Sequence, residues 1–83
     1  MLMYYVYILK CSDNTLYTGI TTNLDRRIEE HNHSSKGAKY TRARRPVKLM
    51  YSEEYVDRST ASKREYQIKK KMTRIEKLEL ICM

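Results

Sequence analysis

The chain has 83 residues, a length that allows one domain, over residues 1–83, with a single modest hydrophobic core. Hydrophobic residues make up 41% of the chain and charged residues 33%, which excludes an intrinsically disordered protein. The 17 Lys and Arg residues exceed the 10 Asp and Glu residues, and the resulting net charge of +7 attracts polyanions, so nucleic acid is the expected partner.

Neither a membrane span nor a metal-binding cysteine pattern is expected. No apolar run reaches the ~18 residues that a membrane-spanning helix requires. The N-terminal stretch MLMYYVYILK lacks a basic leader and a small-residue cleavage site, which predicts a strand rather than a secretion signal. Cys11 and Cys82 have no metal or redox spacing, so we expect a cytoplasmic protein with both thiols free, in preference to a disulfide between them.

A hairpin is predicted at the start of the chain. Residues 4–10 are apolar or aromatic at both odd and even positions, which is typical of a central strand covered on both faces. The Ser-Asp-Asn run at 12–14 favours a tight turn, and residues 16–20 form the returning strand. An odd-length loop would place Tyr7 and Tyr17 on the same face, and an even one would separate them. The sequence leaves this register open.

The helix that follows the hairpin, ending near His33, carries polar residues on its inner side. With Leu24 set at zero and a rotation of about 100° per residue, His31 lies about 20° and Arg27 about 60° from it. Arg26 lies near the opposite pole, toward solvent. A cation held against the edge of a core needs an anion, and a bound phosphate is one candidate.

Residues 34–46 are predicted to be irregular and are strongly basic. A loop of this length in so small a domain is unusual without a function. It is interpreted either as an arm that follows a phosphate backbone or as a solvated run of charge. With one lysine of a later helix, the residues expected to contact nucleic acid are Lys36, Lys39, Tyr40, Arg42, Arg44, Arg45 and Lys69.

The second helix has a carboxylate within its apolar stripe. Ala61, Ile68 and Met72 follow helical spacing, and the position that completes the series is Glu65. Because a buried unpaired charge is costly, Glu65 should be paired with a cation, neutralised, or bound to a metal. One alternative is an internal ion pair with Arg27, which is weak evidence of stability. The other is a phosphate site in which Glu65 binds a hard cation and Arg27 faces phosphate oxygens.

The predicted order is strand, strand, helix, strand, helix, helix, with the third strand at 47–55 and the second helix at 61–72. The fold class is α/β or α+β, with a three-stranded, mainly antiparallel sheet flanked by helices. The last helix should pack Ile75, Leu78 and Ile81 on the core. The helix starts are predicted from three caps, which are Thr22 with Asp25, Ser59 or Thr60, and the capping box of Thr73 with Glu76.

These features together resemble the GIY-YIG endonuclease family. The resemblance rests on Tyr5-Val6-Tyr7, on Tyr17-Thr18-Gly19 ten residues later, on Asn23-Leu24 with Arg27, and on Glu65, and it spans residues 5–70. The segments TGITTNLDRRIEEHN and GAKYTR are similar to those of the small stand-alone bacterial proteins of the UPF0213 group. The chain is also similar to the nuclease domain of structure-specific DNA junction and flap endonucleases.

The resemblance implies a role for five residues. Tyr7 and Tyr17 match the two motif tyrosines, one of which would help to deprotonate the attacking water. Arg27 matches the arginine that stabilises charge on the scissile phosphate, and Glu65 matches the glutamate that binds one divalent metal ion, Mg²⁺ or Mn²⁺. His31 matches a histidine that could act as acid, base or phosphate ligand, or could be a packed helix residue.

Two positions depart from the family pattern. Tyr5 stands where the first motif has glycine, and Ile20 stands where excision nucleases of the family carry a lysine that could lower the pKa of Tyr17. The resemblance implies a metal-dependent endonuclease for DNA repair or recombination, directed by DNA structure rather than sequence, without an obligate protein partner. The alternatives are a non-catalytic nucleic-acid-binding module with the same fold, and an adaptor for an acidic protein.

Overall fold

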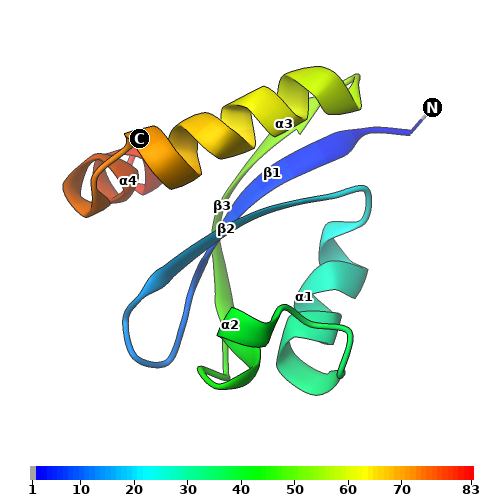
Figure 1. Cartoon of the computed structure of the whole chain (residues 1–83), viewed down its shortest axis with the longest axis vertical. Helices are drawn as coiled ribbons and strands as arrows, with labels where there is room; N and C mark the ends of the chain where they lie inside the picture. Colours follow the sequence, from blue (N-terminus) through cyan, green and yellow to red (C-terminus); the bar gives the residue numbers. More distant parts are fainter. Residues whose placement is uncertain (1) are drawn as a thin grey trace.

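Strand β1 (Tyr4–Lys10) lies at the centre of an antiparallel sheet, between β2 (Leu16–Thr21) and β3 (Lys48–Tyr55). The computed structural model describes residues 2–83, and no helix in that range is long and apolar enough to cross a membrane. Helices lie on both faces of the sheet (Figure 1), which confirms the predicted fold class. They are α1 (Leu24–His33), α2 (Lys39–Arg42), α3 (Arg58–Tyr66), the π-helical turn η1 (Gln67–Lys71) and α4 (Arg74–Ile81).

The hairpin register places the two motif tyrosines on one face. Tyr7 pairs with Gly19, and Leu9 pairs with Tyr17. Because side chains alternate along a strand, Tyr7 and Tyr17 therefore point to the same side of the sheet. The turn runs from residue 11 to residue 15, which is an odd length, and Asn14 adopts the left-handed conformation there with a φ of 67°.

The two faces of the sheet have different cores. The apolar face is built from Val6, Ile8, Ala61, Ile68 and Leu80, all buried between the sheet and the helices α3, η1 and α4. The polar face lies against α1 and α2, where Tyr7, Tyr17, His31 and Thr41 meet. Of these four, only Tyr17 retains more than 1% exposure.

Two helix starts differ from the predictions. The N-cap of α1 is Asn23, not Thr22, and its side chain accepts the Arg26 backbone N–H at 3.1 Å. The N-cap of α3 is Asp57, whose carboxylate accepts the Thr60 backbone N–H at 2.7 Å, so this helix begins at Arg58. Asn and Asp side chains reach these free amides well, which explains why each prevails over the neighbouring hydroxyl residue.

The other corrections concern short elements. Residues 34–46 contain the four-residue helix α2, although the sequence predicts no element there. The second helix ends at Tyr66 and continues as η1, so Met72 lies beyond it. The capping box of α4 is confirmed, but Ile75 is 71% exposed and Leu78 is 39% exposed. This eight-residue helix meets the apolar face along one edge only, through Leu80 and Ile81.

A charged cluster fixes α3 to β3. Arg64 donates two hydrogen bonds to the Glu53 carboxylate, at 2.9 and 3.0 Å, and the Tyr51 and Tyr55 hydroxyls also donate to it. Burial by itself would raise the pKa of Glu53. The hydrogen bonds outweigh burial and lower the pKa to about 2. Glu65 follows Arg64 directly, so this cluster also sets where Glu65 lies.

Candidate active site

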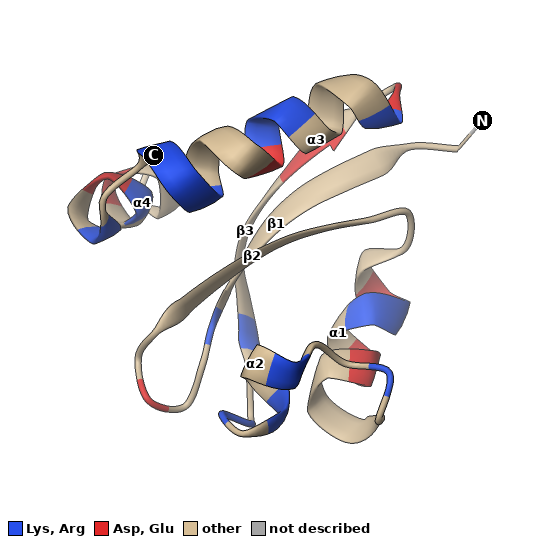
Figure 2. Cartoon of the chain, in the orientation of Figure 1, with Lys and Arg blue, Asp and Glu red and all other residues tan. Residues whose placement is uncertain are grey.

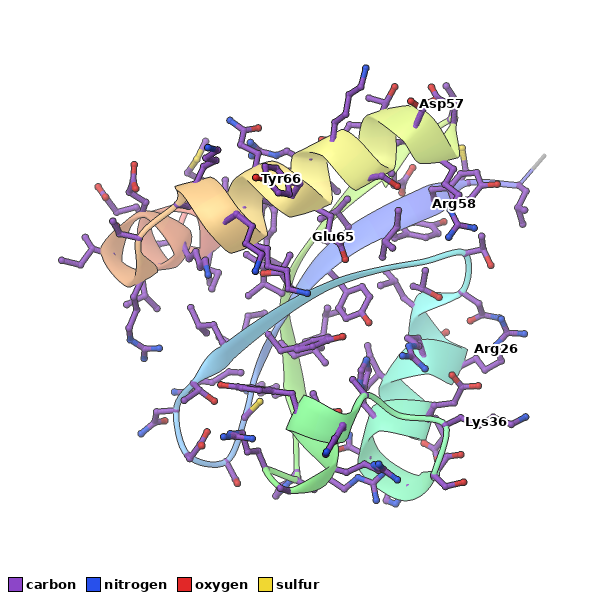
Figure 3. All side chains as sticks on the ribbon, in the orientation of Figure 1. Arg26, Lys36, Asp57, Arg58, Glu65 and Tyr66 are labelled. Carbon is purple, nitrogen blue, oxygen red and sulfur yellow. The ribbon has the colours of Figure 1, made fainter. Side chains whose placement is uncertain are left out.

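The structure brings together three aromatic residues that are far apart in the sequence. Tyr7 comes from β1, Tyr17 from β2 and His31 from α1. Their ring centroids are 6.5 Å apart for Tyr7 and Tyr17, 5.9 Å for Tyr7 and His31, and 5.3 Å for Tyr17 and His31. His31 is fully buried on the inner side of α1, and Figure 3 shows Arg26 on the outer side, as the helical spacing predicts.

Tyr7 and His31 belong to a chain of hydrogen bonds. The Tyr7 hydroxyl lies 2.8 Å from His31 Nε2, and His31 Nδ1 lies 2.8 Å from Thr41 Oγ1. Thr41 Oγ1 in turn donates its proton to the Ala38 carbonyl oxygen at 2.9 Å. Tyr7, His31 and Thr41 are each 1% exposed or less, so the chain is shielded from bulk water.

The protonation states follow from burial and from Arg27. Burial raises the pKa of Tyr7 to about 12, and the nearby Arg27 only partly opposes this. Burial, assisted by the charge of Arg27, lowers the pKa of His31 to about 4. Burial also raises the pKa of Tyr17. At neutral pH the site therefore holds a neutral imidazole beside a protonated Tyr7 hydroxyl.

Gly19 makes the position of Tyr7 possible. A Cβ atom at Gly19 would lie 2.4 Å from the Tyr7 hydroxyl oxygen and 2.6 Å from Cζ of the same ring. Both distances are well inside van der Waals contact, so any side chain at Gly19 would displace the hydroxyl from His31. Glycine is thus needed here for the close approach of a ring, not for an unusual backbone angle.

Arg27 lies beside the aromatic cluster and is held by α1. Its Nη1 donates to Glu30 Oε1 and to the Lys36 carbonyl oxygen, each at 2.9 Å. The ion pair between Arg27 and Glu65, which the sequence left open, is absent from residues 2–83. Both of these hydrogen bonds use Nη1, and Arg27 also lies within hydrogen-bonding reach of the Tyr7 side chain, which lowers the pKa of Tyr7 and raises that of Arg27.

Glu65 faces the tyrosines from the other side of β2. Figure 3 shows its side chain pointing from α3 toward β1 and β2. Its charge contributes to the raised pKa of both Tyr7 and Tyr17, which places the carboxylate within electrostatic reach of the pair. Glu65 is half-buried rather than enclosed in the core, and within residues 2–83 it has neither a hydrogen-bond nor an ion-pair partner. The expectation that Glu65 lies in the middle of the buried stripe is therefore wrong, and of the states expected for it, pairing with a cation of the protein is not seen among residues 2–83.

The predicted basic arm is divided between structural and exposed residues. Arg45 donates to the His31 carbonyl oxygen at 2.5 Å and to those of Glu30 and Ser34, so it caps the C-terminal end of α1. Arg44 pairs with Asp13 at 3.0 Å and covers the Tyr40 ring at 3.9 Å. These two arginines hold the segment in place. The exposed cations of the segment are Lys36, Lys39 and Arg42.

A groove of about 350 Å³ runs beside Tyr17. One wall consists of Tyr17 and Tyr40, whose rings stack at 6.0 Å, and the other is formed by Lys69, Lys70 and Lys77. Lys69 Nζ lies 5.9 Å from the Tyr17 ring centroid. Figure 2 shows the basic residues of η1 and of α2 on opposite sides of β2. The groove thus connects the candidate site with two basic banks, one formed by Lys36, Lys39 and Arg42 and the other by Lys69, Lys70 and Lys77.

Sequence reasoning missed three residues of this site. Lys70 and Lys77 line the groove but were not among the expected nucleic-acid contacts, although Lys70 lies in the same basic run as Lys69. Thr41 contacts His31 from a segment ten residues away, and no local spacing indicates this.

Comparison with known proteins identifies the family. Residues 3–79 match the GIY-YIG catalytic domain. A UPF0213 protein of Syntrophus aciditrophicus is 60% identical, covering 93% of this chain and 87% of its own length, and one of Staphylococcus haemolyticus is 54% identical, covering 98% and 96%. A third, from Desulfotalea psychrophila, is 68% identical over 66 residues, and this chain spans 60% of its length.

Two solved structures have the same fold. A UPF0213 protein of Bacillus halodurans matches with a TM-score of 0.62 and 43% identity, covering 98% of this chain and 84% of that protein. A protein of E. faecalis matches with a TM-score of 0.66 and 42% identity, with the same coverage of both chains. The resemblance drawn from the tyrosine motifs is confirmed, and the chain belongs to the UPF0213 group of the GIY-YIG family.

Proposed function

We propose that this protein is a metal-dependent endonuclease that hydrolyses phosphodiester bonds in DNA and selects its substrate by structure rather than sequence. One observation carries the proposal, namely the 2.8 Å contact between the Tyr7 hydroxyl and His31 Nε2. A tyrosine is a poor base at neutral pH because its hydroxyl is protonated. Tyr7 becomes able to receive a proton from water if it passes its own proton to the neutral imidazole.

Arg27 is the residue that would face the phosphate. Its Nη1 is held by Glu30 and Lys36, and its remaining N–H groups, beside the Tyr7 hydroxyl, would bind phosphate oxygens in the forked geometry that guanidinium groups favour. Arg27 also helps to lower the pKa of His31. A phosphate bound to Arg27 would offset that positive charge and make His31 a better proton acceptor. Substrate binding would therefore activate the base.

A divalent metal ion fits the residues that are present. No group of three or more His, Cys, Asp or Glu side chains gathers anywhere in the described range, which is unlike a structural metal centre. Mg²⁺ usually keeps several waters and uses one or two carboxylates together with substrate phosphate, and Glu65 is a half-buried carboxylate with no other partner among residues 2–83. Bound Mg²⁺ or Mn²⁺ supplies positive charge that stabilises the developing negative charge of the phosphate.

The chemical step then uses four protein groups. The oxygen of a water molecule forms a bond to phosphorus, and its proton moves to the Tyr7 oxygen as the Tyr7 proton moves to His31 Nε2. The bond between phosphorus and the leaving oxygen breaks, and that oxygen keeps the electron pair and takes a proton from solvent. Arg27 stabilises the charge on the other phosphate oxygens, and Glu65 holds the metal.

We assign the base to Tyr7 rather than to Tyr17. Only Tyr7 has an acceptor for its own proton, whereas the Tyr17 hydroxyl has no hydrogen-bond partner within residues 2–83. Tyr17 is more exposed and lines the groove, which suits a residue that contacts the substrate. The assignment requires a water molecule to reach the Tyr7 hydroxyl, although the Tyr7 side chain is only 1% exposed.

That low exposure favours a second candidate, a nucleic-acid-binding module without cleavage activity. Its affinity would come from the two basic banks, Lys36, Lys39 and Arg42 on one side and Lys69, Lys70 and Lys77 on the other. Sequence-independent phosphate contacts of this kind give binding that weakens steeply as salt increases. Ile20, in place of a lysine beside Tyr17, also favours this candidate.

The deciding experiment offers labelled single-stranded, duplex, flap and four-way-junction DNA to the protein with Mg²⁺ or Mn²⁺. Glu65→Ala should abolish metal-dependent cleavage and leave DNA binding intact, and Glu79→Ala, an exposed carboxylate on α4, is the matched control. Tyr7→Phe should lower the cleavage rate more than Tyr17→Phe does, and the reverse order would move the base to Tyr17. Binding without cleavage of any substrate would leave the binding module as the function.

A further inference from the structure

Thr41 is a buried hydroxyl residue to which the proposed reaction assigns no step of its own. It lies in α2, is fully buried, and contacts His31 Nδ1 at 2.8 Å. A threonine hydroxyl has one proton to donate, and that of Thr41 goes to the Ala38 carbonyl oxygen at 2.9 Å. While the hydroxyl donates to Ala38, its single proton is used, and Oγ1 can only accept a hydrogen bond from His31.

This arrangement has one consequence for His31. A neutral imidazole carries a single proton, on either Nδ1 or Nε2. Because Thr41 offers Nδ1 an acceptor, the proton lies on Nδ1, and Nε2 presents its lone pair to the Tyr7 hydroxyl 2.8 Å away. The opposite tautomer would place Nδ1 and Thr41 lone pair against lone pair, and Nε2–H would then donate to the Tyr7 hydroxyl instead of accepting from it.

We propose that Thr41 is a positioning residue that fixes His31 in its Nδ1–H tautomer and thereby makes Nε2 the acceptor of the Tyr7 proton. The direction of the hydrogen bond between Tyr7 and His31 is thus set by a residue of α2 that does not itself react. Without Thr41 the His31 proton would be free to move to Nε2, and Tyr7 could then only accept from the imidazole. The catalytic consequence rests on the proposed function, whereas the tautomer itself does not.

The fold supports this role independently of the reaction. Thr41 donates to Ala38, the residue before α2, so the hydroxyl is locked by its own helix. Arg45 binds the carbonyl oxygens of Glu30 and His31, which ties the segment after α2 to the helix that carries His31. The distance between Thr41 and His31 is therefore fixed at both ends.

The first test measures the tautomer directly by ¹⁵N NMR of the imidazole nitrogens at neutral pH. In the wild-type protein, and in Thr41→Ser, Nδ1 of His31 should carry the proton. In Thr41→Val, which keeps the volume but removes the acceptor, the proton should shift at least partly to Nε2. His33, the exposed histidine at the end of α1, is the internal reference and should not change.

The second test measures cleavage of whichever DNA of the panel above the wild-type protein cuts. Thr41→Val should lower kcat at least tenfold with KM nearly unchanged, since misplaced general acid–base groups commonly cost about 10²-fold or more. Thr41→Ser should restore the rate. If Thr41→Val does not fold, as judged by circular dichroism, Thr41→Ala removes the same acceptor and is measured instead.

The outcomes separate this inference from the proposed function. An unchanged Nδ1–H tautomer in Thr41→Val overturns the inference, whatever the cleavage rate. A shifted tautomer with an unchanged kcat overturns the catalytic role of Thr41. If the wild-type protein cleaves no DNA but the tautomer shifts as expected, the proposed function fails and the assignment of the Thr41 contact stands.

Discussion

The two faces of the sheet differ in what they bury: one is apolar throughout, and the other combines a chain of hydrogen bonds with an apolar cluster that includes Leu9, Cys11 and Val47. On the apolar face, Val6, Ile8 and Ile68 are fully buried among other hydrocarbon side chains. On the polar face, Tyr7, His31 and Thr41 are equally buried and are joined to one another by hydrogen bonds. Burial of hydrocarbon contributes more to stability than a buried hydrogen bond does. We infer that the apolar face provides most of the stability, and the polar face supplies the chemistry.

The largest loss of stability is expected from a substitution on the apolar face. Ile68→Ala should lower the free energy of unfolding by about 3–4 kcal/mol, because it removes buried hydrocarbon and leaves a cavity. Chemical denaturation measures this. Leu78→Ala removes the same kind of side chain from an exposed position and should cost less than about 1 kcal/mol. Equal costs for the two variants would contradict the comparison.

Acid should affect the polar face first. His31 has a pKa of about 4 when folded, against 6.5 for the free side chain, so between these values only the unfolded chain binds the proton. Stability should therefore fall as pH drops from 6.5 to 4, by up to about 3 kcal/mol. Glu53, with its pKa lowered to about 2, loses its contribution only between pH 4.5 and 2. Thermal unfolding across this range measures both.

The control for the acid effect is His31→Gln. This variant should be less stable than wild type at pH 7, but its stability should change little between pH 6.5 and 4.5. The decline below pH 4.5, to which Glu53 contributes, should persist. A wild-type protein equally stable at pH 6.5 and pH 4 would refute the neutral, buried state of His31.

A smaller loss of stability is expected at Tyr7. Tyr7→Phe keeps the ring but removes one buried hydrogen bond, so it should cost about 1–2 kcal/mol while the cleavage rate is lost. Ile68→Ala should do the reverse under conditions where it is folded, with large loss of stability and retained activity per folded molecule. Measuring both properties of both variants tests the division of roles. A Tyr7→Phe protein that keeps full activity would refute it.

The smallest effect on stability is expected in the groove. Lys70→Gln with Lys77→Gln removes two charges from one wall, and the free energy of unfolding should change by less than about 0.5 kcal/mol. DNA affinity should fall, and its dependence on salt should weaken by about 1.5 in the log–log slope. Lys10→Gln with Lys48→Gln, a cross-strand pair whose side chains do not line the groove, makes the same change in net charge and is the control. Equal effects of both pairs would show that only net charge matters.

The sequence predicts correctly those elements in which the hydrophobic residues keep the spacing of one strand or one helix along their whole length. The bounds of β1 are matched, and the inner positions of Arg27 and His31 on α1 follow from helical spacing. Spacing fails where a contact depends on distant segments. Neither Thr41 beside His31 nor Glu53 beside Arg64 could be found this way, because each pair joins separate elements. Ile75 was misplaced because apolar spacing shows a helix face without showing whether the core reaches it.

The pairing of the two hairpin strands restricts how the chain can change. A residue added or removed between positions 11 and 15 changes only the length of the turn if Leu9 still pairs with Tyr17, and both tyrosines then keep their face. A slip of the β1–β2 pairing by one residue would instead turn Tyr17 to the opposite face, although neither tyrosine had been replaced. The turn itself is therefore free to vary in length, and the constraint on the site lies in the pairing of the two strands.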